Sequence, residues 1–130
     1  MKLLLDTHVW LWLEVAPERL SRATAERLAD PGNELWLSTV RAWEHLLLAE
    51  RKRIRVEHEP AAWLRRAFDG QRYRIAALEL ETVLAATGMR IQPRDPADRL
   101  LAATARQLGL SLVTADRRML QGSGFEALPC

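Results

Sequence analysis

The sequence has few residues of the kinds that form covalent cross-links or zinc sites. Cys130 is the only cysteine, so an internal disulfide and a cysteine-based zinc site are both excluded, and with them a disulfide-stabilised secreted domain. The three histidines, His8, His45 and His58, do not have the spacing of zinc ligands. No apolar run approaches the ~20 residues that a membrane-spanning helix needs, because Asp6 interrupts the first run of leucines. We therefore expect a cytoplasmic protein with no membrane association.

Lysine is scarce as well. Of the 19 basic residues, only Lys2 and Lys52 are lysines, and the other 17 are arginines. The forked guanidinium group suits the recognition of phosphate, but genomic codon bias explains the same excess equally well. The net charge of +2 is too small to indicate nucleic-acid binding by itself.

The length and the pattern of elements predict one α/β domain over residues 1–130. A single hydrophobic core usually serves about 100–150 residues, and a chain with 48% hydrophobic and 28% charged residues is typical of folded proteins. Strand-like runs alternate with helix-like segments, which predicts a mostly parallel central sheet with helices on both faces. The predicted strands are 3–5, 35–37, 73–78, 110–113 and 125–128. The predicted helices are 8–14, 21–30, 39–50, 60–70, 81–87, 95–108 and 117–120.

Two acidic residues follow predicted strands. Asp6 comes directly after the first strand, and Asp116 comes shortly after the strand that ends at Val113. The carboxyl ends of parallel strands lie at one edge of a sheet, where sites in such folds are found, so both side chains are expected there. Asp116 also fits a simpler role as the N-cap of the short helix that follows it.

Glu44 lies within the apolar stripe predicted for its helix. Val40, Trp43, Leu47 and Leu48 form this stripe at helical spacing, which places Trp43 in the core. A carboxylate on such a face needs a cation or a hydrogen-bond partner. A salt bridge to an arginine is the simpler alternative.

Another pair of acids begins the clearest helix of the sequence. Asp95 is placed at its N-cap and Pro96 at its first position, and Gly109 stands where a helix-ending glycine belongs. Asp98 lies in the first turn at the edge of the buried face, where capping and the helix dipole also favour an acid. Each acid therefore has an ordinary structural explanation, but their joint arrangement predicts a shared acidic site.

The pieces Leu3–Thr7 (LLLDT), Ser38–Glu44 (STVRAWE), Asp95–Ala102 (DPADRLLA) and Val113–Asp116 (VTAD) follow one another along the chain. In this order and at these distances they resemble the PIN-domain nucleases, and most closely the VapC-type toxins of bacterial and archaeal toxin–antitoxin pairs. The resemblance covers essentially the whole chain. It implies a PIN fold, an endoribonuclease dependent on Mg²⁺ or Mn²⁺, a homodimer and a cognate antitoxin.

The resemblance also assigns functional residues. The acidic site of the family falls on Asp6, Glu44, Asp98 and Asp116, and its hydroxyl positions fall on Thr7 and Thr114. Asp6, Asp98 and Asp116 are then the expected metal ligands, directly or through water, since carboxylates suit Mg²⁺ and Mn²⁺. Glu44 is expected to orient the attacking water or to complete a second metal position, and Thr114 to hold a water or ligand. The implied products carry a 5′-phosphate and a 3′-hydroxyl.

Basic residues beside the acids are the expected RNA contacts. Arg117 and Arg118 adjoin Asp116 and are predicted to bind phosphates, together with the hydroxyl group of Thr7. For the basic run 51–53, a favourable interaction with the C-terminal end of the preceding helix is the simpler explanation.

Three other functions remain to be compared. A PIN-like module that binds a partner without cleaving RNA would be expected to lack one of the four acids, and all four are present. A DNA nuclease with the same site stays open, because nothing in the sequence reads a 2′-hydroxyl group. A phospho-receiver domain needs adjacent acids after the first strand and a late lysine, whereas Thr7 follows Asp6 and no lysine follows Lys52.

Convergence of the four acids would have an energetic consequence. Two like charges about 5 Å apart repel by roughly 3 kcal/mol at an effective dielectric constant near 20. On sequence grounds we therefore expect the metal-free protein to be strained, and Asp6→Asn to be at least as stable as the unchanged protein without metal.

Overall fold

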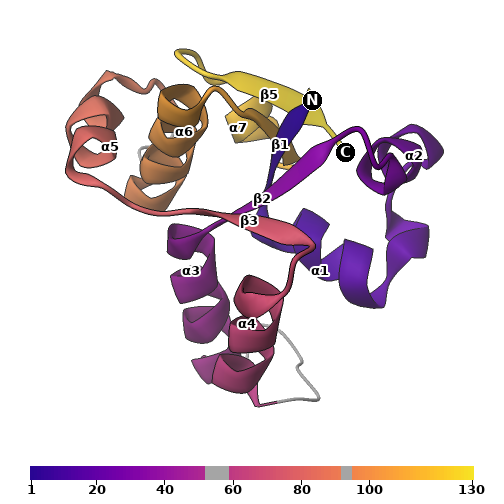
Figure 1. Cartoon of the computed structure of the whole chain (residues 1–130). Helices are drawn as coiled ribbons and strands as arrows, with labels where there is room; N and C mark the ends of the chain where they lie inside the picture. Colours follow the sequence, from indigo (N-terminus) through magenta and orange to yellow (C-terminus); the bar gives the residue numbers. More distant parts are fainter. Residues whose placement is uncertain (52–58, 92–94) are drawn as a thin grey trace.

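A computed structural model describes residues 1–51, 59–91 and 95–130 of the chain. In these ranges five strands form one parallel sheet with the order β3-β2-β1-β4-β5 (Figure 1). In the register of the central strands, Leu3 is paired with Leu35 and Leu4 with Leu112. The predicted α/β architecture and its parallel sheet are confirmed. The strands are β1 (Lys2–Leu5), β2 (Glu34–Ser38), β3 (Tyr73–Ala76), β4 (Ser111–Thr114) and β5 (Glu126–Pro129).

The helices follow the predicted ones closely. They are α1 (Thr7–Val15), α2 (Arg22–Ala29), α3 (Thr39–Glu50), α4 (Pro60–Asp69), α5 (Leu80–Ala85), α6 (Pro96–Leu108) and α7 (Arg117–Leu120), with 3₁₀ turns η1 (Pro17–Arg19) and η2 (Ala86–Gly88). Over the described ranges, none of them combines the length and the apolar character that crossing a membrane requires.

Local capping explains where the helices next to the sheet begin and end. The Asp6 carboxylate accepts a hydrogen bond from the Thr7 backbone N–H at the start of α1, and Ser38 caps α3 by accepting from the N–H of Val40. At the end of α6, Gly109 adopts the left-handed conformation with φ of 63°, which glycine reaches without steric cost. The caps at Asp6 and Ser38 therefore turn the chain sharply from strand to helix at the carboxyl edge of the sheet, whereas Gly109 ends α6 just before β4 begins.

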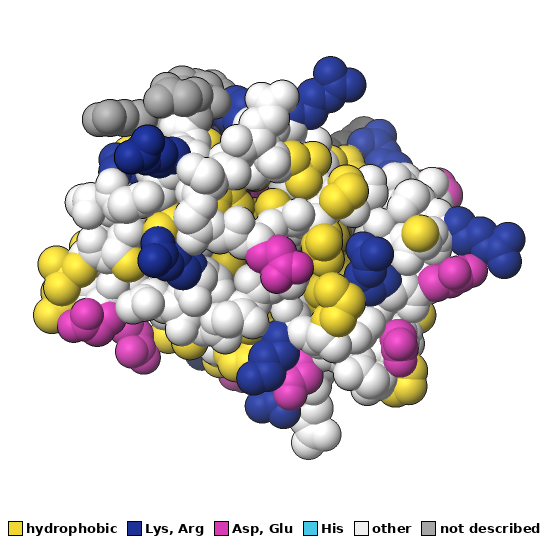
Figure 2. All heavy atoms as spheres, turned by 90° about the horizontal axis from the view of Figure 1, so that it is seen from above, with side chains coloured by type: hydrophobic (Ala, Val, Ile, Leu, Met, Phe, Trp, Pro, Cys, Tyr) yellow, Lys and Arg dark blue, Asp and Glu magenta, His cyan; other side chains and the backbone are white. Residues whose placement is uncertain are grey.

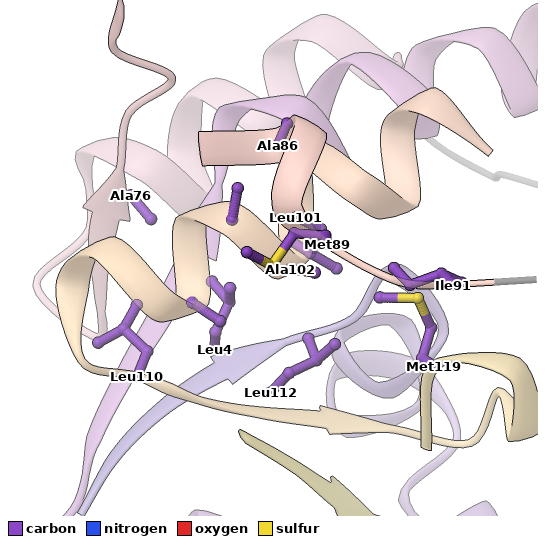
Figure 3. Packing of buried hydrophobic residues seen from close by; sticks show 12 residues of the cluster. Leu4, Ala76, Ala86, Met89, Ile91, Leu101, Ala102, Leu110, Leu112 and Met119 are labelled. Carbon is purple, nitrogen blue, oxygen red and sulfur yellow. The ribbon is translucent and has the colours of Figure 1, made fainter. Parts of the chain in front are cut away.

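Two apolar layers cover the sheet. On one face, Leu4 and Leu112 pack against Leu101 and Ala102 of α6 and against Ala86 of η2 (Figure 3). On the other face, Leu3 and Leu5 belong to a second cluster with α1, α2 and α4. The alternation of β1 side chains between the two layers fixes the direction of its last residue and so the position of Asp6 beyond it.

The buried face of α3 differs from the prediction. Arg41 and His45 are buried, whereas Trp43 is 57% exposed, so the placement of Trp43 in the core is wrong. His45 packs against the rings of Trp10 and Trp63, with centroid separations of 5.9 and 4.9 Å. Arg41 and His45 can therefore occupy the buried face of α3, because the burial of a polar side chain is tolerated when that side chain has partners.

At the end of the molecule where β1 begins, the described residues do not form a continuous basic surface (Figure 2). In Figure 2, which is seen from above, Lys and Arg side chains are interspersed with Asp and Glu side chains and with apolar ones. This distribution fits the small net charge of the chain and does not single out this face for a polyanion.

Candidate active site

The four predicted acids line one pocket at the carboxyl edge of the sheet. The pocket has a volume of about 800 Å³ and is formed by the segments after β1 and β4 together with α3 and the start of α6. Asp6, Glu44, Asp98 and Asp116 all contribute to its wall. The structure therefore brings acids from four separate segments to one pocket, and their role as a catalytic site stays a prediction.

Asp6 is held in place through both carboxylate oxygens. Its Oδ1 accepts a hydrogen bond of 2.7 Å from the backbone N–H of Thr7, and its Oδ2 accepts one of 2.6 Å from the Thr114 hydroxyl. The Thr114 Oγ1 in turn accepts from the backbone N–H of Asp116 at 3.0 Å. Thr114 therefore links the loop after β4 to the acid after β1, which gives this hydroxyl a positioning role.

A buried arginine lies among three of the acids. Arg41 is only 5% exposed. Its Nη2 donates a hydrogen bond of 3.0 Å to Asp98 Oδ1, its Nη1 donates to Glu44 Oε2, and its Nε lies 3.1 Å from Asp6 Oδ1. The carboxylates therefore converge around a guanidinium group, whose positive charge offsets the repulsion on which the expected strain of the metal-free protein rests.

The electrostatics of the site reflect this burial. Loss of hydration raises the pKa of Glu44 and of Asp98, while the nearby Arg41 charge opposes both increases. For Arg41, burial alone would lower the pKa, but the attraction of the three carboxylates, Asp6 above all, outweighs it and raises the pKa. The guanidinium therefore stays charged.

Three carboxylates are close enough to hold a cation together. Ligand oxygens of Glu44, Asp95 and Asp98 all lie within 4.8 Å of one another. Asp98 Oδ2 is buried and has no hydrogen-bond partner among the described residues, although the exposed Arg118 Nη2 lies 3.6 Å away. A buried carboxylate oxygen that lacks a hydrogen-bond donor and lies beside two further acids fits a hard divalent cation such as Mg²⁺ or Mn²⁺.

Asp116 and Arg118 form a pair at the rim of the pocket. Arg118 Nε and Nη2 contact the two Asp116 oxygens at 3.2 and 2.6 Å, and Asp116 also accepts from the Arg118 backbone N–H as the cap of α7. These hydrogen bonds lower the pKa of Asp116. Arg118 lines the pocket, whereas Arg117 is exposed and is absent from the pocket wall.

The structure also places the other residues that the sequence predicted to contact RNA or metal. Thr7 is only 2% exposed but lines the same pocket, and its contact with RNA stays a prediction. The basic run beyond Arg51 lies outside the described residues, but Arg51 itself lines the pocket. The metal-ligand set Asp6, Asp98 and Asp116 stays a prediction.

Two residues of the site were missed as functional candidates. Arg41 stands among apolar residues of the α3 segment, one helical turn before Glu44, and this spacing was the available signal. Asp95 was interpreted as a helix cap, and it is one, since its Oδ1 accepts from the Ala97 and Asp98 N–H groups. The same carboxylate reaches the acidic group, so capping and metal binding do not exclude each other here.

Comparison with known proteins identifies the family. Residues 3–123 match the PIN domain family. The chain is 34% identical over 119 residues to Ribonuclease VapC22 of Mycobacterium tuberculosis. The aligned region covers 89% of this chain and 88% of that protein.

Solved structures have the same fold. The VapBC2 structure from Rickettsia felis, bound to a promoter DNA fragment, contains a chain that superposes with a TM-score of 0.72 at 14% identity, covering 100% of this chain and 99% of that one. The DNA-bound VapBC structure from Salmonella typhimurium gives a TM-score of 0.67 at 17% identity, covering 99% and 98%. The sequence match over nearly the full length, together with this fold, shows that the chain belongs to the PIN domain family.

Proposed function

We propose that the protein is a metal-dependent endoribonuclease that acts in the cytoplasm as the toxin of a toxin–antitoxin pair. The observation that carries this proposal is the convergence of acids from four separate segments on one pocket at the carboxyl edge of the sheet. The relative in Mycobacterium tuberculosis, which is named as a ribonuclease, supports the choice of RNA as substrate.

The proposed cofactor is Mg²⁺ or Mn²⁺. Glu44, Asp95 and Asp98 would hold it, because their oxygens already lie within 4.8 Å of one another. Asp6 and Asp116 line the same pocket and would bind it directly or through water. A divalent ion at this place supplies an activated water and neutralises charge on the phosphate.

The chain's own side chains have distinct roles in this proposal. Glu44, one of the residues that would hold the metal, would also orient the attacking water. Thr114 fixes Asp6 and the loop that presents Asp116 through its two hydrogen bonds. Arg118 is placed at the rim, with its side chain 44% exposed, and provides a contact for an RNA phosphate. Arg117 would contribute from outside the pocket.

A cognate antitoxin is the proposed protein partner. The pocket is flanked by apolar side chains, of which Trp43 is 57% exposed, next to the acids. An antitoxin segment with an apolar anchor and a basic side chain matches both features and would block the acids. The VapBC neighbours among solved structures support a partner of this kind.

A homodimer is also proposed. Exposed apolar side chains on and before α5 offer a surface that a second copy would cover, since contiguous exposed apolar area marks interaction sites. Leu80 is 70% exposed, and the other members of this surface are Leu78, Val83 and Leu84.

The proposal is tested by incubating the purified protein with a panel of tRNA and rRNA in Mg²⁺ or Mn²⁺. Cleavage that stops on chelation and leaves 5′-phosphate ends is expected. A parallel panel of single- and double-stranded DNA separates the alternative nuclease, which would cut DNA instead. RNA that stays intact in both metals, with folded protein, would point to the non-catalytic binding module.

A further inference from the structure

Arg41 differs from every other arginine near the site in its burial and in its partners. Its side chain is 6% exposed, against 44% for Arg118, and its guanidinium contacts three carboxylates from three segments. A buried arginine with one acid is an ion pair, but a buried arginine with three acids occupies the kind of position in which a polyvalent cation is otherwise found.

The place of Arg41 in its helix strengthens this argument. It is the third residue of α3, close to the N-terminal end, where the helix dipole disfavours a cation. The helix dipole therefore does not favour a positive charge here. The acids are what stabilise it, and two of them, Asp6 and Asp98, come from other segments of the chain.

The two oxygens of Asp98 face different surroundings. Oδ1 accepts the hydrogen bond from Arg41, whereas Oδ2 is buried without a hydrogen-bond partner in the described ranges, and the exposed Arg118 Nη2 lies 3.6 Å from it. On the other side, Glu44 and Asp95 approach Asp98 to within 4.8 Å. The site therefore has two cation positions that share Asp98 and Glu44, and a guanidinium fills one of them.

We propose that Arg41 is a positioning residue that takes the place of a second metal ion, so that the site binds one divalent cation per chain, at Glu44, Asp95 and Asp98. This inference rests on the proposed metal dependence. Arg41 holds Asp6, Glu44 and Asp98 in place before the metal arrives, and its fixed charge also limits how tightly the metal binds.

The test counts bound Mn²⁺ by electron paramagnetic resonance of the free ion and records thermal melts in EDTA. The proteins are the unchanged chain, Arg41→Met, Arg41→Lys, and Arg22→Met as a control. Arg22 is an exposed arginine whose salt bridge, among the described residues, is to Glu26, four residues on. We expect one Mn²⁺ per unchanged chain and per Arg22→Met chain.

Arg41→Met should bind two Mn²⁺ per chain, with the first at least about tenfold tighter, because a positive charge beside the ion is gone. It should also melt at a lower temperature in EDTA. Arg41→Lys keeps the charge without the fork, so it should retain the count of one and lose part of the thermal stability.

Two Mn²⁺ per unchanged chain would overturn the inference, and this count needs no variant. An Arg41→Met protein that binds one Mn²⁺ as tightly as the unchanged chain would also overturn it. If the unchanged chain cleaves RNA in EDTA and binds no Mn²⁺, the proposed metal dependence fails as well. That outcome is distinct from a count of two, in which only the role of Arg41 fails.

Discussion

The metal-free stability of Asp6→Asn distinguishes a preformed ion-pair cluster from a set of repelling acids. In the structure, the Asp6 carboxylate contacts Arg41 Nε at 3.1 Å and accepts from the Thr114 hydroxyl at 2.6 Å. Asparagine preserves the size of the side chain and can still accept from the Thr7 N–H. It removes the negative charge that faces the buried guanidinium, so Asp6→Asn should destabilise the protein.

The magnitude follows from the number of partners that remain. Removing one partner of an isolated buried ion pair costs about 3–5 kcal/mol. Arg41 keeps Glu44 and Asp98, so the loss is closer to that of one charged hydrogen bond, about 1.5–3 kcal/mol. For a chain of this size, 1 kcal/mol corresponds to about 3–5 °C, so the melting temperature in EDTA should fall by about 5–15 °C.

Thermal and urea unfolding in EDTA at constant ionic strength measure this effect. Asp30→Asn is the matched control, because Asp30 is an exposed acid whose Oδ1 accepts from the Gly32 N–H at 2.8 Å, which asparagine can replace. The control should change the free energy of unfolding by less than about 0.5 kcal/mol. An Asp6→Asn protein as stable as the unchanged one, or more stable, would refute the Arg41-centred arrangement and restore the picture of repelling acids.

Other substitutions test neighbouring parts of the site. Thr114→Val should cost about 1–3 kcal/mol of unfolding free energy in urea, because the Asp6 oxygen loses its donor, and Thr114→Ser should recover most of it. Arg118→Ala should raise the KM for RNA, and it should reduce the slope of log KM against log salt by about the amount expected for one phosphate contact. Arg117→Ala should have a smaller effect on both, because Arg117 does not line the pocket. Equal effects of the two substitutions would mean that RNA does not follow the pocket. Because burial raises the pKa of Glu44 above its ordinary 4.5, the folded state takes up this proton before the unfolded state does as pH falls. The contribution of Glu44 to the free energy of unfolding is therefore full below pH 4.5 and is lost as pH rises through the raised pKa. Glu44→Gln should remove this pH dependence from unfolding measured in EDTA. A pH profile identical to that of the unchanged chain would contradict this prediction.

Local signals accounted for most of the fold. Ser38, Asp95 and Gly109 each act through bonds to the next few residues, so their sequence context is enough to place a helix end. The strands were predicted for the same reason, since short apolar runs bounded by turn residues need little tertiary information. The acids after β1 and β4 then met at one edge because parallel strands bring their carboxyl ends together.

The interior of the site depended on contacts that the sequence does not show. Arg41 is buried because Asp6 and Asp98, distant in sequence, come together around it. His45 is buried because aromatic rings from α1 and α4 surround it. Hydrophobic periodicity takes no account of such long-range partners, and it therefore assigned Trp43 to the core instead.

The most direct measurement of the central claim is the rate of RNA cleavage by Asp98→Asn in saturating Mg²⁺ or Mn²⁺, beside the unchanged chain and Asp30→Asn. Asp98 contacts Arg41 through one oxygen and offers the other, buried and without a hydrogen-bond donor, to the proposed metal. The account predicts a loss of at least about a hundredfold in cleavage for a protein that still gives a cooperative melt, with Asp30→Asn unaffected. Cleavage by folded Asp98→Asn at the rate of the unchanged chain would contradict the assignment of this pocket as the catalytic site.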